Sequence, residues 1–252
     1  SATQERSLGL GAMGWHSYLH KHRIPFESEM AETKNNQIFE YIKSEAVAET
    51  EQLAIERGEC PDMGGTGRRN SHLLAIAPNA NTSIICGTSP SIEPNKANAY
   101  THRTRAGSYL VKDRYLEEEL VEAGKNDADT WSSIITNGGS VQHLKFLSDE
   151  VKEVFKTAIE IDQDAIISLG ADRQKYLCQG QSLNVFFPAG ASKKDLHKIH
   201  YNAWKLGCKG LYYLRTETSN KAENVSTKVV RDALKDYETQ VMSQEECESC
   251  SG

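Results

Sequence analysis

Two cysteines near the C-terminus have the spacing of a redox dithiol. Cys247 and Cys250 form a Cys-x-x-Cys pair at the end of a polar segment. Such a pair can cycle between dithiol and disulfide when a flexible, solvent-accessible tether carries it. It could also be half of a zinc site, but a structural zinc ion needs four ligands and the chain has no second Cys pair. The neighbouring glutamates raise thiol pKa values, which favours a relay of reducing equivalents over an aggressive nucleophile.

Tyr212 and Tyr213 are adjacent phenols within Leu211–Thr216. Tyrosine favours strands, and neighbours in a regular strand face opposite sides of the sheet, so a structural pair is the default interpretation. A functional role for the pair is favoured by its position, because it ends an expected β-α-β unit and precedes the polar tail with the dithiol. Stacked rings would require that the strand ends or twists at this point.

Other suggestive patterns carry little chemical weight. The glycine cluster at 64–67 lacks the lysine and the spacing of a phosphate-binding P-loop. His16 and His20 stand four apart, but no glutamate follows the first as in His-Glu-x-x-His. His197 and His200 fit a solvated helix surface. We assign these groups to structure and expect no metal site in the chain.

Hydrophobic periodicity and end signals predict the main elements. A long helix is expected over 28–57, a short buried strand over 73–77, and a helix over 148–170 capped by Ser148. The expected apolar stripes are Ile38, Ile42, Ala46 and Leu53 in the first helix, and Val151, Phe155, Ile159, Asp162 and Ile166 in the second.

The stretch from 181 to 216 reads as one compact β-α-β unit. Strands are expected over 181–187 and 211–215, and Ser192 with Asp195 resembles a capping box for the helix between them. Two strands joined by a crossover helix should lie parallel. These patterns predict an α/β fold.

Composition narrows the class of protein. The net charge of −6 gives no electrostatic footprint for nucleic-acid binding, and no apolar run is long enough to span a bilayer. No signal peptide precedes the fold, so we expect a soluble, cytoplasmic protein. Residues 218–252 are polar and without sustained periodicity, which predicts a flexible tail. The remaining cysteines, Cys60, Cys86, Cys178 and Cys208, are interpreted as small buried hydrophobes.

Seven short motifs, in matching order and spacing, resemble the large catalytic subunits of class I ribonucleotide reductases. They are Ser7–Trp15, Arg69–Leu73, Ala77–Ser83, Ser91–Pro94, Gln181–Asn184, Tyr212–Thr216 and Glu246–Cys250. The resemblance implies the C-terminal portion of the ten-stranded α/β barrel of these subunits. It places the barrel part at 1–217 and a flexible tail at 218–252.

The resemblance also implies a substrate site. Asn79, Ala80, Asn81, Thr82 and Ser83 match the family's loop that cradles the diphosphate of a ribonucleoside diphosphate. Small side chains let backbone N–H groups approach an anion, and Thr82 and Ser83 offer hydroxyl donors. If a helix begins at about Ile84, its N-terminus adds roughly 0.3–2 kcal/mol for a well-placed charge.

Roles for the tyrosines and the tail cysteines follow from the same resemblance. Tyr212 and Tyr213 match a radical relay that passes an oxidising equivalent from the small subunit toward an active-site cysteine. Cys247 and Cys250 match the shuttle that re-reduces the active-site disulfide and is itself reduced by thioredoxin or glutaredoxin.

In this family the thiyl-forming cysteine lies upstream of the segment that matches Ser7–Trp15. We therefore expect a split or interrupted large subunit, such as a divided gene or an intein junction at Ser1. Its partners would be an N-terminal fragment, the radical-generating small subunit and the substrate, and the chain alone would be inactive. No cofactor is expected on this chain, because the metal-containing small subunit supplies the radical.

Two alternatives stay open at the level of sequence. One is a non-catalytic remnant or assembly module that keeps the fold without radical chemistry, although such a module needs neither the Tyr pair nor the dithiol. The other is a zinc-binding tail for protein recognition, which metal analysis of the purified chain would decide.

Overall fold

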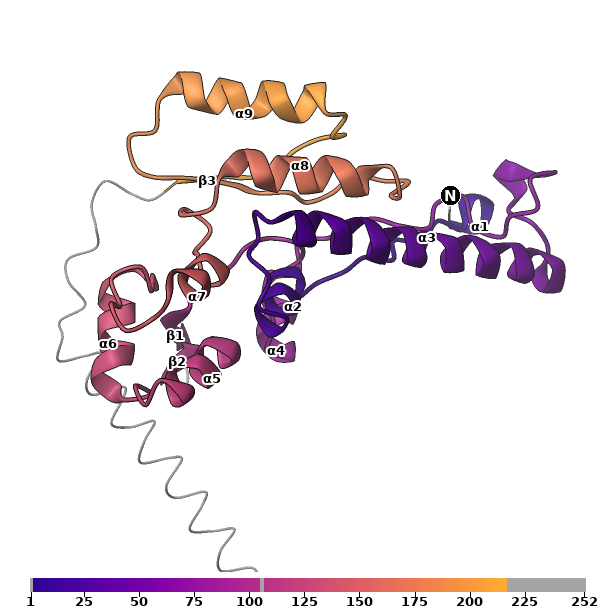
Figure 1. The fold of residues 1–252 in the computed structure, drawn as a ribbon. Coiled ribbons are helices and arrows are strands. Elements are labelled where there is room, and N and C mark those ends of the chain that lie inside the picture. The colour runs from indigo at the N-terminus through magenta and orange to yellow at the C-terminus, as the bar shows by residue number, and fades with distance from the viewer. Residues whose placement is uncertain (1, 105–106, 217–252) are drawn as a thin grey trace, which may run out of the picture. The chain divides into compact units, whose positions relative to one another are not determined.

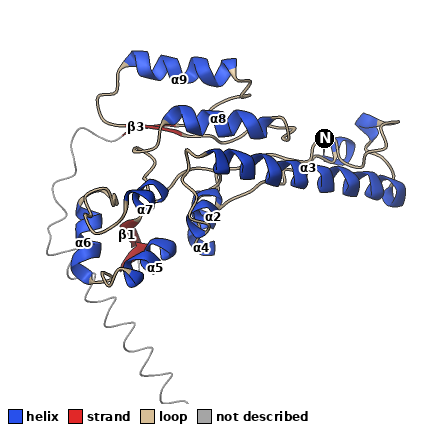
Figure 2. Ribbon diagram, in the orientation of Figure 1, coloured by secondary structure: helices blue, strands red, loops and turns tan. Residues whose placement is uncertain are grey.

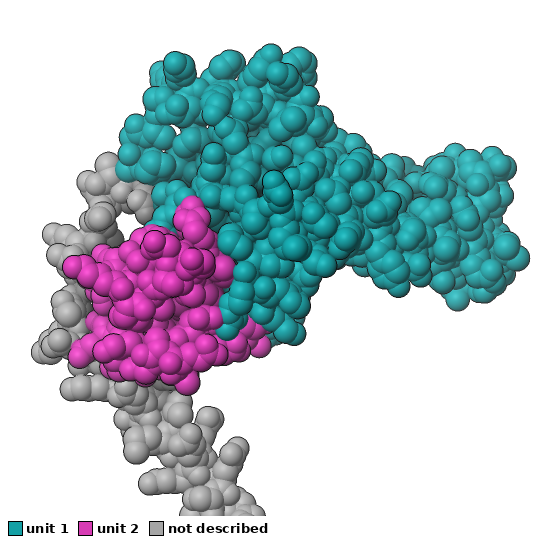
Figure 3. Space-filling view, in the orientation of Figure 1, with its two compact units in different colours: residues 1–94, 159–216 teal, residues 95–158, 217–252 magenta. Residues whose placement is uncertain are grey.

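The computed structural model describes residues 2–104 and 107–216, which fold into two compact units (Figure 3). The first unit contains the chain up to Pro94 and Ile159–Thr216, and the second contains Asn95–Ala158. The predicted tail and its dithiol lie outside the described residues.

The first unit is mainly helical with a small parallel sheet (Figures 1 and 2). Its elements are α1 (Ala2–Glu5), α2 (Trp15–Lys21), α3 (Glu29–Arg57), the 3-10 turn η1 (Pro61–Met63), α4 (Ala80–Cys86), α8 (Gln163–Gln174), β3 (Val185–Phe187), α9 (Lys193–Lys205) and β4 (Leu214–Thr216). Helix α8 contacts both α3 and α9.

Helix α3 has clear sequence signals at both ends. The Ser28 hydroxyl accepts the N–H of Ala31 at 3.2 Å and so caps the first turn. Gly58, at φ 79°, donates its N–H to the carbonyl of Ala54 at 2.9 Å, where the helix stops. The helix expected over 28–57 is confirmed.

The buried face of α3 differs from the expected stripe, whose residues Ile38, Ile42, Ala46 and Leu53 are only half-buried. The buried residues are Ala31, Asn35, Phe39, Thr50 and Ala54. Asn35 is fully buried, and its polar groups have partners there. Its oxygen accepts a 2.8 Å hydrogen bond from Nε of Arg173 on α8, and its nitrogen donates to the Leu169 carbonyl at 3.0 Å. The buried Arg173 guanidinium also lies 5.5 Å from the Phe39 ring centroid. A buried polar pair therefore sets this helix–helix contact.

The predicted β-α-β unit is present as β3, α9 and β4, with the two strands parallel and Val185 paired with Leu214. The Ser192 hydroxyl accepts the Asp195 N–H at 3.1 Å and donates to the Asp195 carboxylate at 2.7 Å, so it caps α9 as expected. The strands are shorter than predicted, three residues each. Strand β3 is fully buried, as a parallel strand usually is.

The strand expected over 73–77 is present as extended backbone that pairs on both sides. Leu74 forms an isolated parallel bridge with Leu10, and Ile76 forms one with Gln181. Leu74 and Ile76 are buried, in agreement with the apolar run. Each pairing is too short to make a full strand.

The single helix predicted over 148–170 is wrong. The chain forms α7 (Asp149–Val154) and α8, with a break between them. Ser148 caps α7 as expected, by accepting the Val151 N–H. Asp162, interpreted from sequence as a helix-edge residue, instead caps α8 by accepting the Asp164 N–H at 2.9 Å. The aspartate is a helix-start signal that the apolar stripe obscured.

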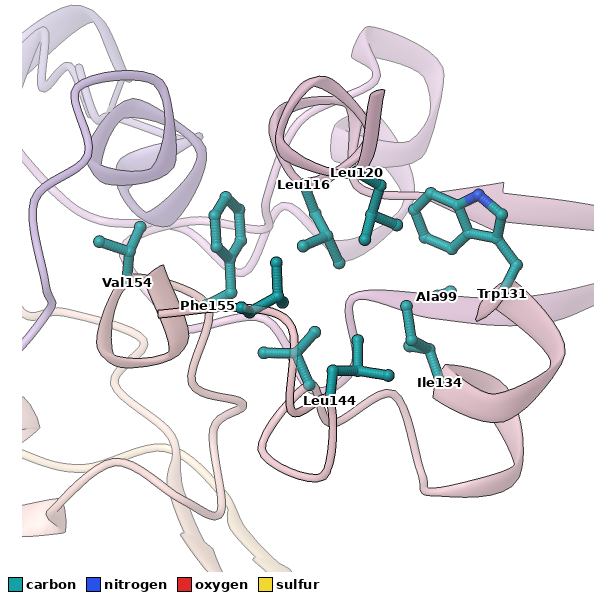
Figure 4. Close-up of a cluster of buried hydrophobic side chains, with 10 residues drawn as sticks. Ala99, Leu116, Leu120, Trp131, Ile134, Leu144, Val154 and Phe155 are labelled. Atoms are coloured by element: carbon teal, nitrogen blue, oxygen red, sulfur yellow. The ribbon is translucent and has the colours of Figure 1, made fainter. Parts of the chain in front are cut away.

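The second unit surrounds an antiparallel hairpin, β1 (Ala99–Thr104) and β2 (Gly107–Lys112), with α5 (Arg114–Glu122), α6 (Ala128–Thr136) and α7. Figure 4 shows its core, to which these elements and the following loops contribute Ala99, Leu116, Leu120, Trp131, Ile134, Val141, Leu144, Leu147, Val154 and Phe155. The Trp131 indole N–H donates to the side-chain carbonyl of Asn126 at 2.7 Å, so the buried ring keeps its polar partner.

Within the part of the chain that the structure describes, no helix is long and apolar enough to cross a membrane.

Candidate functional site

Tyr212 and Tyr213 lie side by side just before β4. Their ring centroids are 4.1 Å apart with an interplanar angle of 52°, and the side chains are 46% and 50% exposed. Hydrogen bonding and charge interaction with the neighbouring Tyr213 phenol raise the pKa of Tyr212. The Arg215 guanidinium lies 4.8 Å from the Tyr213 ring centroid. The two rings are thus in contact, an arrangement expected from the sequence only if the strand ends or twists at this point. Strand β4 begins only at Leu214, so the tyrosines lie outside the regular strand.

The backbone under the tyrosines is held by buried groups. The Tyr212 N–H donates to the Leu183 carbonyl at 2.8 Å, and the Tyr213 N–H donates to Oδ1 of Asn184 at 2.9 Å. Asn184 in turn donates through Nδ2 to Oε1 of Glu93 at 2.7 Å. Asn184 and Glu93 are 3% and 6% exposed. Sequence reasoning used both residues only as parts of family motifs, and no local signal links positions so far apart.

The predicted diphosphate loop forms the first turn of α4. Asn79 occupies the N-cap position, and among the described residues no side chain caps this helix. Ala80, Asn81 and Thr82 are exposed. The helix begins earlier than the expected start near Ile84, so the loop itself supplies the first-turn N–H groups. The Ala80 N–H donates to the Pro78 carbonyl at 3.0 Å, whereas those of Asn81 and Thr82 have no intrahelical acceptor.

Ser83 differs from its neighbours in the loop. Its side chain is buried, and its hydroxyl donates to the Ala80 carbonyl at 2.8 Å. Its N–H donates to the Asn79 carbonyl at 2.9 Å. Both donors of Ser83 therefore serve the turn itself.

The four described cysteines are not all buried. Cys60 is fully buried and its thiol donates to the Gln4 and Glu5 carbonyls. Cys178 and Cys208 are half-buried. Cys86 is exposed, which corrects its assignment as a buried hydrophobe.

The remaining candidates have structural roles. His16 and His20 are buried with ring centroids 4.0 Å apart, and burial, followed by the neighbouring His20, lowers the pKa of His16. His197 and His200 are exposed on α9, as expected. In residues 2–104 and 107–216 no three His, Cys, Asp or Glu side chains are grouped to hold a metal ion.

The backbone N–H groups of the glycine cluster at 64–67 bind a carboxylate of the same chain. The Glu59 carboxylate accepts the N–H of Gly65 at 2.5 Å and that of Gly67 at 2.9 Å. The loop therefore folds around its own glutamate, in agreement with the structural assignment.

Comparison with known proteins identifies the family. The sequence profile described as "Ribonucleotide reductase, barrel domain" matches residues 1–66 and 62–214. The alpha subunit of a class Id ribonucleotide reductase from Actinobacillus ureae has a similar structure, with a TM-score of 0.81 and 43% identity over 87% of this chain and 40% of that one. The chain belongs to the ribonucleotide reductase barrel-domain family, and the predicted α/β barrel fold class is confirmed.

Its relatives are large subunits. A Frog virus 3 (isolate Goorha) protein provisionally named ribonucleoside-diphosphate reductase large subunit is 52% identical over the whole chain and 43% of its own length. The ribonucleoside-diphosphate reductase large subunit of Invertebrate iridescent virus 6 is 47% identical over 90% of the chain and 24% of its own length. The chain therefore corresponds to part of a large subunit and spans less than half the length of these relatives.

Proposed function

We propose that this chain contributes to a class I ribonucleotide reductase, which reduces ribonucleoside diphosphates to deoxyribonucleoside diphosphates by radical chemistry for DNA synthesis. The observation that carries the proposal is the contact between the Tyr212 and Tyr213 rings at 4.1 Å in a chain of this family.

The tyrosine pair serves as the radical relay. In each step one phenol loses an electron and a proton while its oxidised neighbour regains them. Ring contact keeps the electron-transfer distance between the two phenols short. Half-exposed rings remain accessible to the small subunit, whose metal centre supplies the oxidising equivalent.

The loop at 79–83 holds the substrate diphosphate. The exposed first turn of α4 presents backbone N–H groups, and its uncapped N-terminus favours negative charge. Asn81 and the Thr82 hydroxyl are accessible to oxygen atoms of the substrate. Asn79, Ala80 and Ser83 support the turn, with Ser83 bonded inside it.

Reducing equivalents return through Cys247 and Cys250. The pair opens the active-site disulfide by exchange, which leaves the disulfide on the tail, and thioredoxin or glutaredoxin then reduces it. The target disulfide and the thiyl-forming cysteine lie in the part of the large subunit upstream of this segment, so turnover requires that part as well.

Reconstitution tests this proposal. The purified chain, the N-terminal fragment and the small subunit are combined, and conversion of a ribonucleoside diphosphate is followed with thioredoxin as reductant. We expect turnover only from the complete mixture, and loss of turnover without loss of substrate binding for Tyr212→Phe or Tyr213→Phe. Turnover by the chain alone contradicts the need for the upstream part, and normal turnover by either variant contradicts the relay.

Replacement of both tail cysteines distinguishes a role in returning electrons from a role in substrate reduction itself. The variant with Cys247→Ser and Cys250→Ser should lose turnover driven by thioredoxin but still complete a single reduction per enzyme. Loss of that first reduction would instead assign the tail a structural role.

A further inference from the structure

The pairing between the segments that carry β3 and β4 is irregular at the tyrosines. In the register that pairs Val185 with Leu214, a regular parallel ladder continued by two residues would have the Tyr213 N–H donate to the Leu183 carbonyl. Instead the Tyr212 N–H makes that bond, at 2.8 Å, while the Tyr213 carbonyl accepts the Val185 N–H at 3.0 Å. The tyrosine segment therefore holds one extra residue, which is the definition of a β-bulge.

Because of the bulge, the Tyr213 N–H cannot donate to the Leu183 carbonyl, its acceptor in a regular ladder. A side chain accepts this N–H instead. Oδ1 of Asn184 accepts this N–H at 2.9 Å. Because Asn184 is 3% exposed, water is a poor substitute for the amide oxygen.

Glu93 fixes which end of the amide faces the tyrosine. A carboxylate oxygen accepts hydrogen bonds, so the 2.7 Å contact with Oε1 of Glu93 requires the Nδ2 end of Asn184. The oxygen end is then turned toward the Tyr213 N–H. These two hydrogen bonds link Glu93, Asn184 and Tyr213, which lie in three segments that are distant in sequence. Glu93 and Asn184 are buried, whereas the Tyr213 side chain is half-exposed.

We propose that Asn184, oriented by Glu93, is a positioning residue that stabilises the bulge and so places both phenols on the same side. In a regular strand Tyr212 and Tyr213 would alternate, and a slip of one residue transfers a side chain to the opposite face. Holding one extra residue in the tyrosine segment removes this alternation and allows the ring contact. The proposal rests on the radical relay for its functional meaning, whereas its geometric content stands on the hydrogen bonds alone.

Two buried substitutions of the same pair provide the test. Asn184→Leu removes the acceptor at similar volume. The double variant Asn184→Asp with Glu93→Gln keeps the bond from the Tyr213 N–H and reverses only the bond between the two side chains. NMR of the full chain with ring-labelled tyrosine measures nuclear Overhauser contacts between the two rings, which Tyr212→Phe and Tyr213→Phe assign. Titration of the phenols gives the pKa of Tyr212.

For Asn184→Leu we expect loss of the contacts between the rings and a Tyr212 pKa that falls toward its ordinary value, because the adjacent Tyr213 phenol raises it. The double variant should keep both signals. Preserved ring contacts in a folded Asn184→Leu protein would overturn the proposal, as would their loss in the folded double variant. If Asn184→Leu does not fold, Asn184→Ser, whose hydroxyl is one bond shorter, replaces it with the same expectations.

Turnover of the reconstituted enzyme separates this inference from the proposed function. For Asn184→Leu we expect kcat to fall about tenfold or more with KM unchanged, since only the relay is displaced. Normal kcat with separated rings would overturn the positioning role. Turnover by Tyr213→Phe would overturn the relay itself, whereas loss of turnover in Tyr213→Phe with normal kcat in Asn184→Leu would overturn the inference alone.

Discussion

Cys178 and Cys208 are half-buried thiols whose surroundings shift their pKa values in opposite directions. Burial tends to raise the pKa of Cys178, but its Sγ accepts the N–H groups of Leu73 and Leu74 at 2.9 and 3.0 Å, and Lys43 adds positive charge. The net effect lowers the pKa of Cys178. Burial raises the pKa of Cys208, although Arg173 opposes it in part.

We therefore predict that Cys178 is alkylated at lower pH than Cys208. The thiolate is the reacting species, and a lowered pKa provides more of it at a given pH. Iodoacetamide labelling across a pH series, with peptide mass spectrometry, gives a midpoint for each cysteine. The exposed Cys86 serves as the accessibility control. A Cys178 midpoint at or above that of Cys208 would show that the backbone donors do not stabilise its thiolate.

The tyrosines show how far residue-level prediction reaches. The sequence places Tyr212 and Tyr213 next to an expected strand and leaves two outcomes, alternation or contact. The structure gives contact, because the Asn184 side chain intervenes from a position 29 residues away. Such a tertiary hydrogen bond leaves no trace in local propensity, so the bulge was not predictable.

At the scale of elements, helix α6 depends on the cap provided by Asp127. Its carboxylate accepts the Thr130 N–H at 2.8 Å, and this bond lowers the pKa of Asp127. We predict that Asp127→Ala costs about 1 kcal/mol in free energy of unfolding at neutral pH, whereas Asp127→Asn, which can still cap, costs much less. Urea denaturation measures both, followed by tryptophan fluorescence in a Trp15→Phe, Trp204→Phe background so that Trp131 on α6 is the reporter.

The pH dependence of this cap has a definite sign. Because the folded pKa of Asp127 lies below the unfolded value of about 3.9, the stabilisation by its charge is present above that value. It is lost as pH falls through the folded pKa. The advantage of the native chain over Asp127→Asn should therefore shrink in acid, and an advantage that grows in acid would contradict the charged cap.

Phe155 marks the end of α7 and fills the core of the second unit, where it is fully buried. We predict that Phe155→Ala lowers the free energy of unfolding by about 3–5 kcal/mol, through lost burial and a cavity. Phe146→Ala is the matched control, because Phe146 in the same unit is 40% exposed and should cost under about 0.5 kcal/mol. Equal losses in denaturation experiments would contradict the core described here.

End signals and periodicity predicted most elements but not every boundary. Ser148 and Ser192 cap helices where expected, and the parallel pairing of the β-α-β unit is confirmed. The break between α7 and α8 was missed, since an apolar stripe runs through it and Asp162 was given the wrong role. Local patterns specify helix starts better than they specify interruptions, which depend on packing.

For the molecule as a whole, the sequence motifs led to the correct family and fold class. They could not give the division of the described chain into two compact units, which depends on long-range contacts. The chain spans less than half the length of its large-subunit relatives. We propose that Tyr212 and Tyr213 carry an oxidising equivalent when the rest of the enzyme is present.

Electron paramagnetic resonance tests this claim most directly. Tyr213 is replaced with 3-aminotyrosine, which is oxidised more easily and traps a passing radical, and the chain is mixed with the N-terminal fragment, small subunit and a ribonucleoside diphosphate. We predict an aminotyrosyl radical at position 213 that grows as the small-subunit radical declines, and a weaker signal when Tyr212→Phe is also present. A small-subunit radical that decays during substrate reduction with no aminotyrosyl signal would contradict the relay.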